Sequence, residues 1–295
     1  MDSELKVVSV KRLAGRPKRQ QNRMAADLGD AIAGHCIDVH FQPQYELRTG
    51  RCCGVEALAR WMQSSGRETP PSLFIPIAER YGMIGAIGVS VLYQSCATLL
   101  EWPEFAVRPA ILSVNVSAQQ LTDDFGAVVG SIIDLTGFPG SSLELEVTET
   151  TLISNFKRAA RCLNACKQLG VRIALDDFGT GYSSLDYLLK LPVDRIKLDR
   201  YFVGRLCSDR KAAAIVRAVV ALGEDTGVEV LAEGIESEAD LKALDALGCR
   251  QGQGNLLCRS LPADQARSLM REPWGARFKG GARMHCPDGG GLHAA

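Results

Sequence analysis

Residues 171–182 read Val-Arg-Ile-Ala-Leu-Asp-Asp-Phe-Gly-Thr-Gly-Tyr, and the interpretation of the whole chain starts from them. The apolar run at 171–175 predicts a buried strand. It ends in two adjacent carboxylates, Asp176 and Asp177, before a loop that contains two glycines. Buried carboxylates are costly without a balancing positive charge, and two of them side by side repel each other. A pair of divalent metal ions would resolve both problems. The alternative is a helix N-cap, because Asp often caps the helix that follows a turn.

Short apolar strands alternate with helical segments on both sides of this stretch. Strands are predicted at 110–117, 143–149, 194–199, 228–236 and 250–257, and helices at 125–135, 156–169, 182–191, 212–222, 239–247 and 263–270. This alternation implies a parallel sheet covered by helices. No glycine-rich dinucleotide fingerprint follows the first strand, so a closed (β/α)8 barrel is favoured over an open Rossmann sheet. Two earlier strands, 38–47 and 52–61, flank a predicted hairpin turn at 48–51.

Polar side chains stand at or near the C-terminal ends of the predicted strands, where barrel enzymes build their active sites. They are Asn115, Glu146, Asp176, Lys197, Glu233 and Gln253, together with Glu56 in the second strand. Four acids and two amides, without clustered His or Cys, favour Mg²⁺ or Mn²⁺ over zinc. Each residue alone has another explanation: Glu56 could pair with Arg60, and 143–149 could be a strand with one solvent-facing side.

Composition and charge bound the class of protein. Of the 295 residues, 46% are hydrophobic and 23% are charged, as in an ordinary soluble domain, and the formal net charge of zero gives no strong field for nucleic acid or membrane. No apolar run reaches the roughly 20 residues of a membrane helix, and the first residues lack a signal-peptide core. The 10 cysteines are scattered without C-x-x-C pairs, which predicts reduced core thiols in a cytoplasmic protein.

Both ends of the chain differ from the middle. Residues 1–23 are rich in Lys and Arg with few apolar anchors, and they predict a basic, disordered tail rather than a nucleic-acid contact. Residues 271–295 are glycine-rich and polar and predict a second disordered tail. The folded domain is therefore expected at 24–270, with a first helix at 24–33.

The motifs resemble those of a known family. Glu56-Ala57-Leu58 with Arg60 is similar to the signature of EAL-domain cyclic di-GMP phosphodiesterases. Further motifs match in order over residues 24–270: Phe41-Gln42-Pro43, the segment at 112–115, Glu146 to Glu149, 176–181, Lys197-Leu198-Asp199, 232–236 and Gln253-Gly254. The resemblance implies a TIM-like barrel whose first strand is antiparallel to the others. It also implies hydrolysis of cyclic di-GMP to linear 5′-pGpG, with two Mg²⁺ or Mn²⁺ ions per site, and a homodimer.

The same resemblance implies a role for each matching residue. Glu56, Asn115, Glu146 and Asp176 would hold the first metal ion, and Asp176 and Asp177 the second. Lys197 and Glu233 would position or deprotonate the attacking water, and Gln253 would help to order it. Glu56 would be a catalytic residue as well as a metal ligand. Gln42, Arg60 and Asp199 would contact the substrate. Glu149 and the loop residues Phe178, Gly179, Thr180 and Gly181 would couple metal binding to dimerisation.

Three positions depart from the family pattern. Asn255 stands where an aromatic residue is usual, Leu257 where Phe is usual, and Ser260 where proline is usual. These departures concern the nucleotide pocket rather than the metal chemistry. They leave open a cyclic di-GMP receptor that binds without cleaving and signals through a protein partner. A third hypothesis, a regulator that acts through its basic tail, depends on residues 1–23 alone.

Overall fold

Eight strands close into a barrel in this computed structural model, which describes residues 18–63, 66–103, 105, 110–179, 188–270 and 274. The barrel strands are β1 (Ile37–Glu46), β2 (Cys52–Met62), β4 (Ile111–Val116), β5 (Leu143–Thr148), β6 (Arg172–Phe178), β7 (Arg195–Leu198), β8 (Glu229–Ala232) and β9 (Gln251–Gly252). They neighbour one another in the order β1-β9-β8-β7-β6-β5-β4-β2, and β2 pairs back with β1. The sequence prediction of a (β/α)8 barrel is confirmed.

The first strand runs against its neighbours, as expected. β1 is antiparallel to both β2 and β9, whereas the pairs from β2 to β4 and onward to β9 are parallel. The turn between β1 and β2 places Gly50 at a φ of 71°, a left-handed conformation that glycine adopts without steric cost. Two short strands, β3 (Glu68–Thr69) and β10 (Leu261–Pro262), extend the sheet beside β2 and β1.

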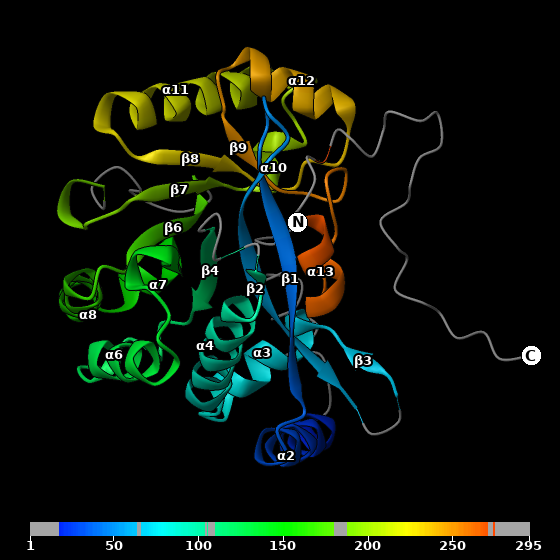
Figure 1. Ribbon diagram of the computed structural model, residues 1–295, viewed down its shortest axis with the longest axis vertical. Coiled ribbons are helices and arrows are strands. Elements are labelled where there is room, and N and C mark those ends of the chain that lie inside the picture. Colours follow the sequence, from blue (N-terminus) through cyan, green and yellow to red (C-terminus); the bar gives the residue numbers. More distant parts are fainter. Residues whose placement is uncertain are drawn as a thin grey trace, which may run out of the picture.

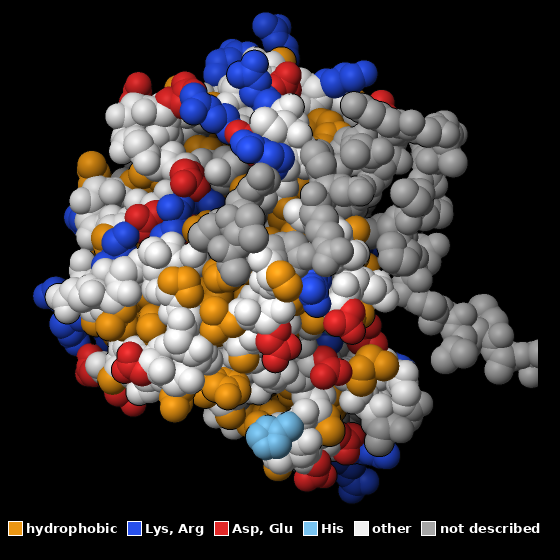
Figure 2. Space-filling view, in the orientation of Figure 1, with side chains coloured by type: hydrophobic (Ala, Val, Ile, Leu, Met, Phe, Trp, Pro, Cys, Tyr) orange, Lys and Arg blue, Asp and Glu red, His pale blue; other side chains and the backbone are white. Residues whose placement is uncertain are grey.

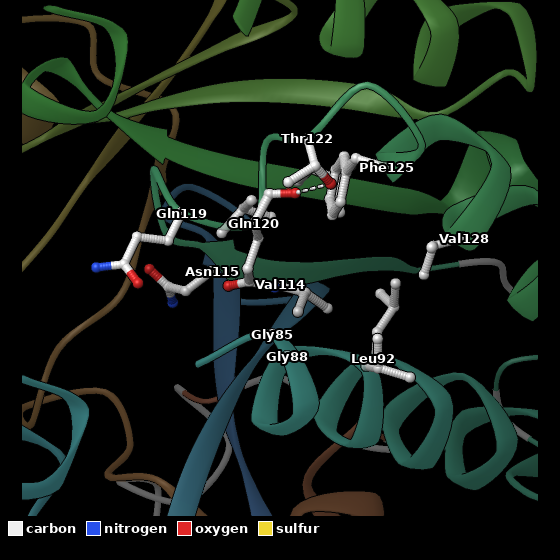
Figure 3. A pocket seen from close by; sticks show the side chains of 13 residues that line it. Gly85, Gly88, Leu92, Val114, Asn115, Gln119, Gln120, Thr122, Phe125 and Val128 are labelled. Atoms are coloured by element: carbon white, nitrogen blue, oxygen red, sulfur yellow. Dashed lines mark hydrogen bonds between the residues drawn. The ribbon is translucent and has the colours of Figure 1, made fainter. Parts of the chain in front are cut away.

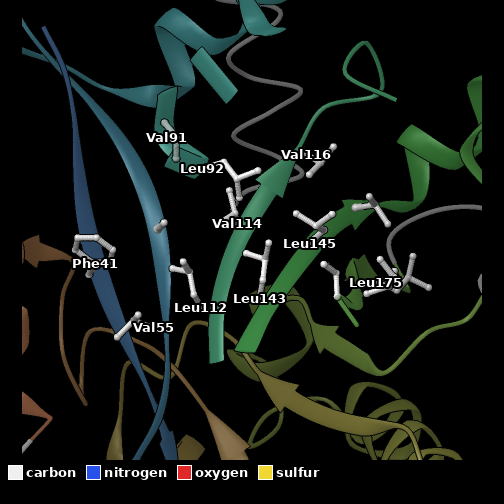
Figure 4. Packing of buried hydrophobic residues seen from close by; sticks show 14 of the residues in the cluster. Phe41, Val55, Val91, Leu92, Leu112, Val114, Val116, Leu143, Leu145 and Leu175 are labelled. Carbon is white, nitrogen blue, oxygen red and sulfur yellow. The ribbon is translucent and has the colours of Figure 1, made fainter. Parts of the chain in front are cut away.

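Helices cover the outside of the barrel (Figure 1). They are α2 (Lys18–Ala33), α3 (Pro71–Arg80), α4 (Ile84–Leu100), α6 (Phe125–Thr136), α7 (Glu149–Ser154), α8 (Phe156–Gln168), α10 (Arg200–Val203), α11 (Arg210–Thr226), α12 (Glu238–Ala246) and α13 (Ala263–Leu269). α4, α6 and α8 pack in that order along one flank. Apolar side chains of the strands, including Leu112, Val114 and Leu145, face these helices and form the core with Val91 and Leu92 of α4 (Figure 4).

The barrel interior is polar, in contrast to the layer under the helices. Arg195 of β7 donates to Glu144 of β5 (Nη1 to Oε1, 2.6 Å) and to Gln44 of β1 (Nη1 to Oε1, 3.3 Å). Side chains from β1, β5 and β7 can meet only inside the barrel, because these strands are not neighbours. Arg172 and Glu229 belong to the same network. In it, Glu144 and Glu229 each contact both Arg172 and Arg195. We call Gln44, Ser113, Glu144, Arg172, Arg195 and Glu229 the lower layer.

The lower layer corrects one alternative from the sequence. The acidic and apolar alternation at 143–149 could have marked a strand with one solvent-facing side, but Glu144 and Glu146 are at most 1% exposed. Both acids point into the barrel, where Arg195 and Lys197 of β7 balance them. The alternation of acidic and apolar side chains was therefore correctly interpreted as a strand. The alternative that its acidic side faces solvent was wrong, because a closed barrel buries both sides of its strands.

Other boundaries also moved. α2 begins at Lys18, so residues 18–23, which the sequence analysis placed in the tail, are helical and contribute the buried Gln21. The last strand is shorter than predicted, because β9 ends at Gly252 and the chain turns at 254–258. The backbone N–H of Trp274 donates to Gly50 O. The domain limits at 24 and 270 otherwise stay predictions, and the helical pattern predicted at 182–191 lies largely outside the described residues.

The surface agrees with the neutral composition. The face shown in Figure 2 carries both positive and negative side chains. Large apolar side chains are exposed on α4 at Val89 and Tyr93 and on α6 at Leu135. Within the described ranges, no helix combines the length and apolar character needed to cross a lipid bilayer. The nine cysteines of the described residues are all free, and six of them are buried; Cys36 and Cys207 are exposed, so they are not the core thiols that the sequence predicted.

The lower layer predicts a large stability effect. Replacing Arg195 by Met leaves Glu144 buried without its shortest ion pair, and we expect the free energy of unfolding to fall by about 3 to 5 kcal/mol. Urea denaturation measures this loss. The matched control is Arg161→Met, which removes an exposed ion pair with Asp123 and should cost less than about 1 kcal/mol. Equal losses for the two variants would show that the lower layer has no special energetic weight.

Candidate active site

A buried lysine lies at the centre of the barrel mouth. The Lys197 ammonium is 2.6 Å from Glu146 Oε2 and 2.7 Å from Glu233 Oε1. It is also 3.6 Å from Glu56 Oε2 and 3.6 Å from Asp176 Oδ1. These carboxylates come from β2, β5, β6 and the end of β8. We call the four carboxylates and Lys197 the acidic centre. The structure thus brings together five of the seven residues predicted at the strand ends.

The two amides of the predicted set bind the same centre. Asn115 Nδ2 donates to Glu56 Oε1 and Gln253 Nε2 donates to Glu56 Oε2, both at 2.7 Å. Gln253 Nε2 also donates to Glu233 Oε1 at 3.0 Å. Glu56 is therefore fixed by amide donors on both oxygens. All seven predicted strand-end residues meet at one place.

Asp177 adopts an unusual backbone conformation next to this centre. Its φ is 55°, a left-handed value that non-glycine residues rarely take, and β6 is irregular between Leu175 and Phe178. Asp tolerates this conformation better than most residues. Asp176 and Asp177 are 7% and 8% exposed. Both carboxylates are thus buried next to the irregularity, where the side chains of a strand no longer alternate in the regular way.

The acidic centre contains more negative than positive charge. Burial raises the pKa of Glu146 well above its ordinary value, and the charge of Glu56 adds to this rise. Burial likewise raises the pKa of Glu233, against the opposing effect of Lys197. Burial lowers the pKa of Lys197. The negative charges of the surrounding carboxylates, of which Asp176 has the largest effect, together raise it by more, so the pKa lies well above its usual value. The raised pKa favours the charged form of Lys197, and four acidic side chains face this one ammonium.

The donor set suits a hard divalent cation, but Lys197 now holds the carboxylates. No three His, Cys, Asp or Glu side chains of the described residues are arranged as a preformed metal site. Two buried oxygens, Glu146 Oε1 and Gln253 Oε1, have no hydrogen-bond partner among those residues. Such oxygens are costly unless a donor or cation binds them. Oxygen ligands with surplus negative charge fit Mg²⁺ or Mn²⁺ better than softer metals.

The three predicted substrate contacts flank the acidic centre in sequence or register, with Gln42 opposite Glu56 across the β1–β2 ladder, and each has polar partners of its own. Gln42 Nε2 donates to the backbone oxygen of Cys258 at 3.0 Å. Asp199 caps α10, since its Oδ1 accepts from the N–H of Tyr201 at 2.8 Å. Arg60 pairs with Glu68 at 3.4 Å and donates to Ser260 Oγ. The suggested Glu56–Arg60 ion pair is therefore replaced by amide partners for Glu56 and by Glu68 for Arg60.

Ser260 gives one departure from the family pattern a structural role. Proline at this position would have no hydroxyl, so the hydrogen bond that fixes the Arg60 guanidinium depends on this chain's own residue. Burial lowers the pKa of Arg60, and Glu68 partly offsets that effect. The other departures differ in setting: Leu257 is 4% exposed in the core, whereas Asn255 is exposed.

The predicted coupling loop is described only in part. Glu149 begins α7 and is 2% exposed. Phe178 ends β6, and Gly179 follows at a φ of 91°. A Cβ at Gly179 would lie 2.9 Å from the ring of Phe202, so α10 packs directly under this loop. Thr180 and Gly181 lie outside the described residues. The role of the loop in dimerisation stays a prediction.

The comparison with family models decides the identity of this barrel. The model described as "EAL domain" matches residues 25–260. The chain belongs to the EAL domain family. Its Glu56-Ala57-Leu58 motif lies on β2, with Glu56 in the acidic centre.

Curated relatives of this EAL domain include signalling proteins of several bacteria. The chain is 38% identical over 250 residues to the bifunctional diguanylate cyclase/cyclic di-GMP phosphodiesterase MucR of Pseudomonas aeruginosa, a match that covers 84% of this chain and 36% of MucR. It is 37% identical over 232 residues to a cyclic di-GMP phosphodiesterase of the same organism, covering 78% and 39%. The oxygen sensor protein DosP of Escherichia coli is 34% identical over 248 residues, covering 84% and 31%. The chain thus spans about a third of the length of these relatives.

Solved structures agree with this assignment. The MucR phosphodiesterase in complex with c-di-GMP superposes with a TM-score of 0.78 at 38% identity, covering 83% of this chain and 99% of that chain. The EAL enzyme Bd1971, in the form bound to cAMP and cyclic di-GMP, has a TM-score of 0.81 at 29% identity, covering 92% of this chain and 74% of that chain. The EAL barrel is therefore the fold of this chain.

Sequence reasoning missed a pocket that adjoins the site. A cavity of about 190 Å³ lies between α4 and β4, with Asn115 and Gln119 at one end and Leu92 and Val128 at the other (Figure 3). The Gln120 side chain lies against α4 where a Cβ at Gly88 would be. Gly85 and Gly88 in an otherwise apolar helix were the available signal, because glycine in a helix interior often marks a close approach.

The raised pKa values predict how stability depends on pH in EDTA-treated protein. Above about pH 5 the folded state keeps protons on Glu146 and Glu233 that the unfolded chain has released, so the free energy of unfolding should fall as pH rises toward 8. The stability due to Lys197 is lost only above its raised pKa, beyond this window. Urea denaturation at several pH values measures the slope.

Glu146→Gln should flatten this slope, because the amide has no proton to lose. Glu224→Gln is the matched control, since Glu224 pairs with Arg250 on the surface with its side chain 56% exposed, and it should leave the slope unchanged. A wild-type stability that rises between pH 5 and 8 would contradict the assignment.

Proposed function

We propose that this EAL domain is a metal-dependent phosphodiesterase that hydrolyses cyclic di-GMP to linear 5′-pGpG. Family membership and relatives named as cyclic di-GMP phosphodiesterases support hydrolysis of this nucleotide. EAL phosphodiesterases depend in general on divalent metal ions. The single observation that carries the proposal for this chain is the complete acidic centre, in which Glu56, Glu146, Asp176 and Glu233 surround one lysine.

Glu56, Asn115, Glu146 and Asp176 would hold one Mg²⁺ or Mn²⁺ ion. Asp176 and Asp177 would hold a second. A bound divalent ion lowers the pKa of its water and so supplies a nucleophile near neutral pH. Glu146 Oε1, buried and without a hydrogen-bond partner among the described residues, supports a cation at this end of the barrel. The surplus of carboxylates over ammonium supports the same conclusion, since a divalent ion would balance it.

The chain's own groups divide the proton chemistry between them. Lys197 stays protonated, because its pKa is raised, and it therefore stabilises negative charge rather than accepting a proton. Glu233 has a raised pKa in the metal-free site and a side chain that is 14% exposed. A divalent ion nearby would favour its carboxylate form, in which it is the better proton acceptor of the two. Gln253 bridges Glu56 and Glu233 and keeps this carboxylate in place. These assignments separate the roles of Lys197 and Glu233, which the motif alone left joined.

The decisive test is a product assay. Purified protein with Mg²⁺ or Mn²⁺ should convert cyclic di-GMP to pGpG, as followed by chromatography, and EDTA should stop the reaction until the metal is restored. Glu56→Gln should abolish turnover, and Glu233→Gln should lower kcat by about 10²- to 10⁴-fold while the nucleotide still binds. Glu224→Gln is the surface control and should act like the wild type.

Different failures have different meanings. Wild-type protein that binds cyclic di-GMP but leaves it intact with either metal would select the receptor hypothesis. Protein that neither binds nor cleaves it would exclude both. A homodimer remains a proposal that follows from the family resemblance alone, and a cytoplasmic location remains a proposal that follows from the cysteine pattern and the N-terminal residues.

A further inference from the structure

Arg200 is a partly buried cation at the barrel mouth that the proposed chemistry does not use. It follows Asp199 at the C-terminal end of β7, three residues after Lys197, and opens α10. Its Nε and Nη2 atoms are buried and have no hydrogen-bond partner among the described residues. Buried guanidinium nitrogens without acceptors are costly. The position therefore calls for an acceptor that the described residues do not supply.

The stem of Arg200 is held against the loop after β8. A Cβ at Gly234 would lie 2.2 Å from Arg200 Cβ, and Gly234 has a φ of 66°. Only glycine permits both the close approach and this conformation. Gly234 directly follows Glu233, the carboxylate 2.7 Å from Lys197. The guanidinium of Arg200 is thus anchored beside the backbone that carries a residue of the acidic centre.

The ion pair of Arg200 is longer and more exposed than those of the buried Arg195. Its Nη1 is 4.0 Å from Glu236 Oε1, and the Glu236 side chain is 61% exposed. Arg195, in contrast, contacts two carboxylates at 2.6 and 2.7 Å. A long pair with an exposed carboxylate contributes little. The Nε and Nη2 edge of Arg200 therefore has no acceptor of comparable strength among the described residues.

That edge has the geometry of an oxyanion site. Nε–H and one N–H of Nη2 point in parallel from one side of the planar group and match two oxygens of a phosphate. In the cyclic order of the barrel, β7 lies four strands from β2 in both directions, so Arg200 and Arg60 border opposite sides of the mouth. Arg60 already donates to Ala59 O and Ser260 Oγ. Arg200 therefore has fewer acceptors of its own than Arg60.

We propose that the Nε and Nη2 edge of Arg200 binds a phosphate group of the cyclic dinucleotide. This inference rests on the proposed function and adds a second anchoring point across the mouth from Arg60. Because cyclic di-GMP has two phosphates on opposite sides of its ring, a cation on each side of the mouth matches its charge distribution. Arg200 is a binding residue in this assignment, and the proton chemistry stays with Glu233.

The test compares nucleotide affinity and turnover in a small set of variants. The Kd of cyclic di-GMP is measured by calorimetry in EDTA, and KM and kcat are measured with Mn²⁺. Arg200→Met should weaken binding and raise KM by about 10- to 100-fold, the range expected for charged, bidentate hydrogen bonds, with kcat changed by less than about threefold. Arg200→Lys keeps the charge and the stem but loses the fork, and should weaken binding by an intermediate factor.

Two controls separate binding from a structural role. Glu236→Gln removes the only ion-pair partner found for Arg200 in the described part of the chain and should leave Kd within about twofold. Arg205→Met removes a nearby guanidinium that stacks on Tyr201, 3.7 Å from the ring centroid, and should also leave Kd unchanged. Thermal unfolding without nucleotide checks each variant, and Arg200→Lys carries the test if Arg200→Met does not fold.

Three results would overturn the assignment. Wild-type affinity in both Arg200 variants would exclude a phosphate contact. An equal loss of affinity in Glu236→Gln would show that Arg200 acts through Glu236 as a structural pair. If wild-type protein neither binds nor hydrolyses cyclic di-GMP, the proposed function fails together with the assignment, whereas normal wild-type binding with unaffected variants defeats the assignment alone.

Discussion

The central constraint in this barrel is the placement of two buried cations on one short strand. Arg195 and Lys197 are two residues apart on β7, so both side chains point into the barrel, and each is at most 1% exposed. Arg195 balances Glu144 and Glu229, and Lys197 contacts the four carboxylates above them. Without these cations, the acids of β2, β5, β6 and β8 would repel one another in a medium that solvates charge poorly. The strand of four residues thus organises both charged layers.

The two layers differ in charge balance, and that difference separates structure from chemistry. In the lower layer, two arginines meet two glutamates, and each arginine contacts both of them. In the acidic centre, four carboxylates share one ammonium, and a buried oxygen of Glu146 has no hydrogen-bond partner among the described residues. A balanced network stabilises the fold as it stands. An unbalanced network of the same residue types has capacity left for a cation or a proton, and this capacity is the basis of the proposed chemistry.

The sequence predicted the fold and the acidic centre because both follow from local patterns. The run at 171–177 and its counterparts place polar residues at strand ends, and barrel closure then brings these ends together. Asp177 is different: its left-handed φ is a tertiary feature, and only the nearby glycines hinted at an irregular backbone. Glu144 was given a solvent-facing alternative, because a period of two does not distinguish an open sheet from the interior of a barrel. Arg60, Gln42 and Asp199 matched motifs, but their partners lie outside those motifs. Arg60 contacts Glu68 and Ser260. Gln42 donates to Cys258 O, and Asp199 accepts from the N–H of Tyr201.

The lower layer also determines how the interior communicates with solvent. Its side chains span the barrel from β1 through β5 to β7, and their charges are already matched by one another. A hydrated ion that entered from that side would have to break these pairs and leave its own water behind. The acidic centre is therefore open to solvent on one side only, at the mouth, beside Glu233 and the loops after β7 and β8.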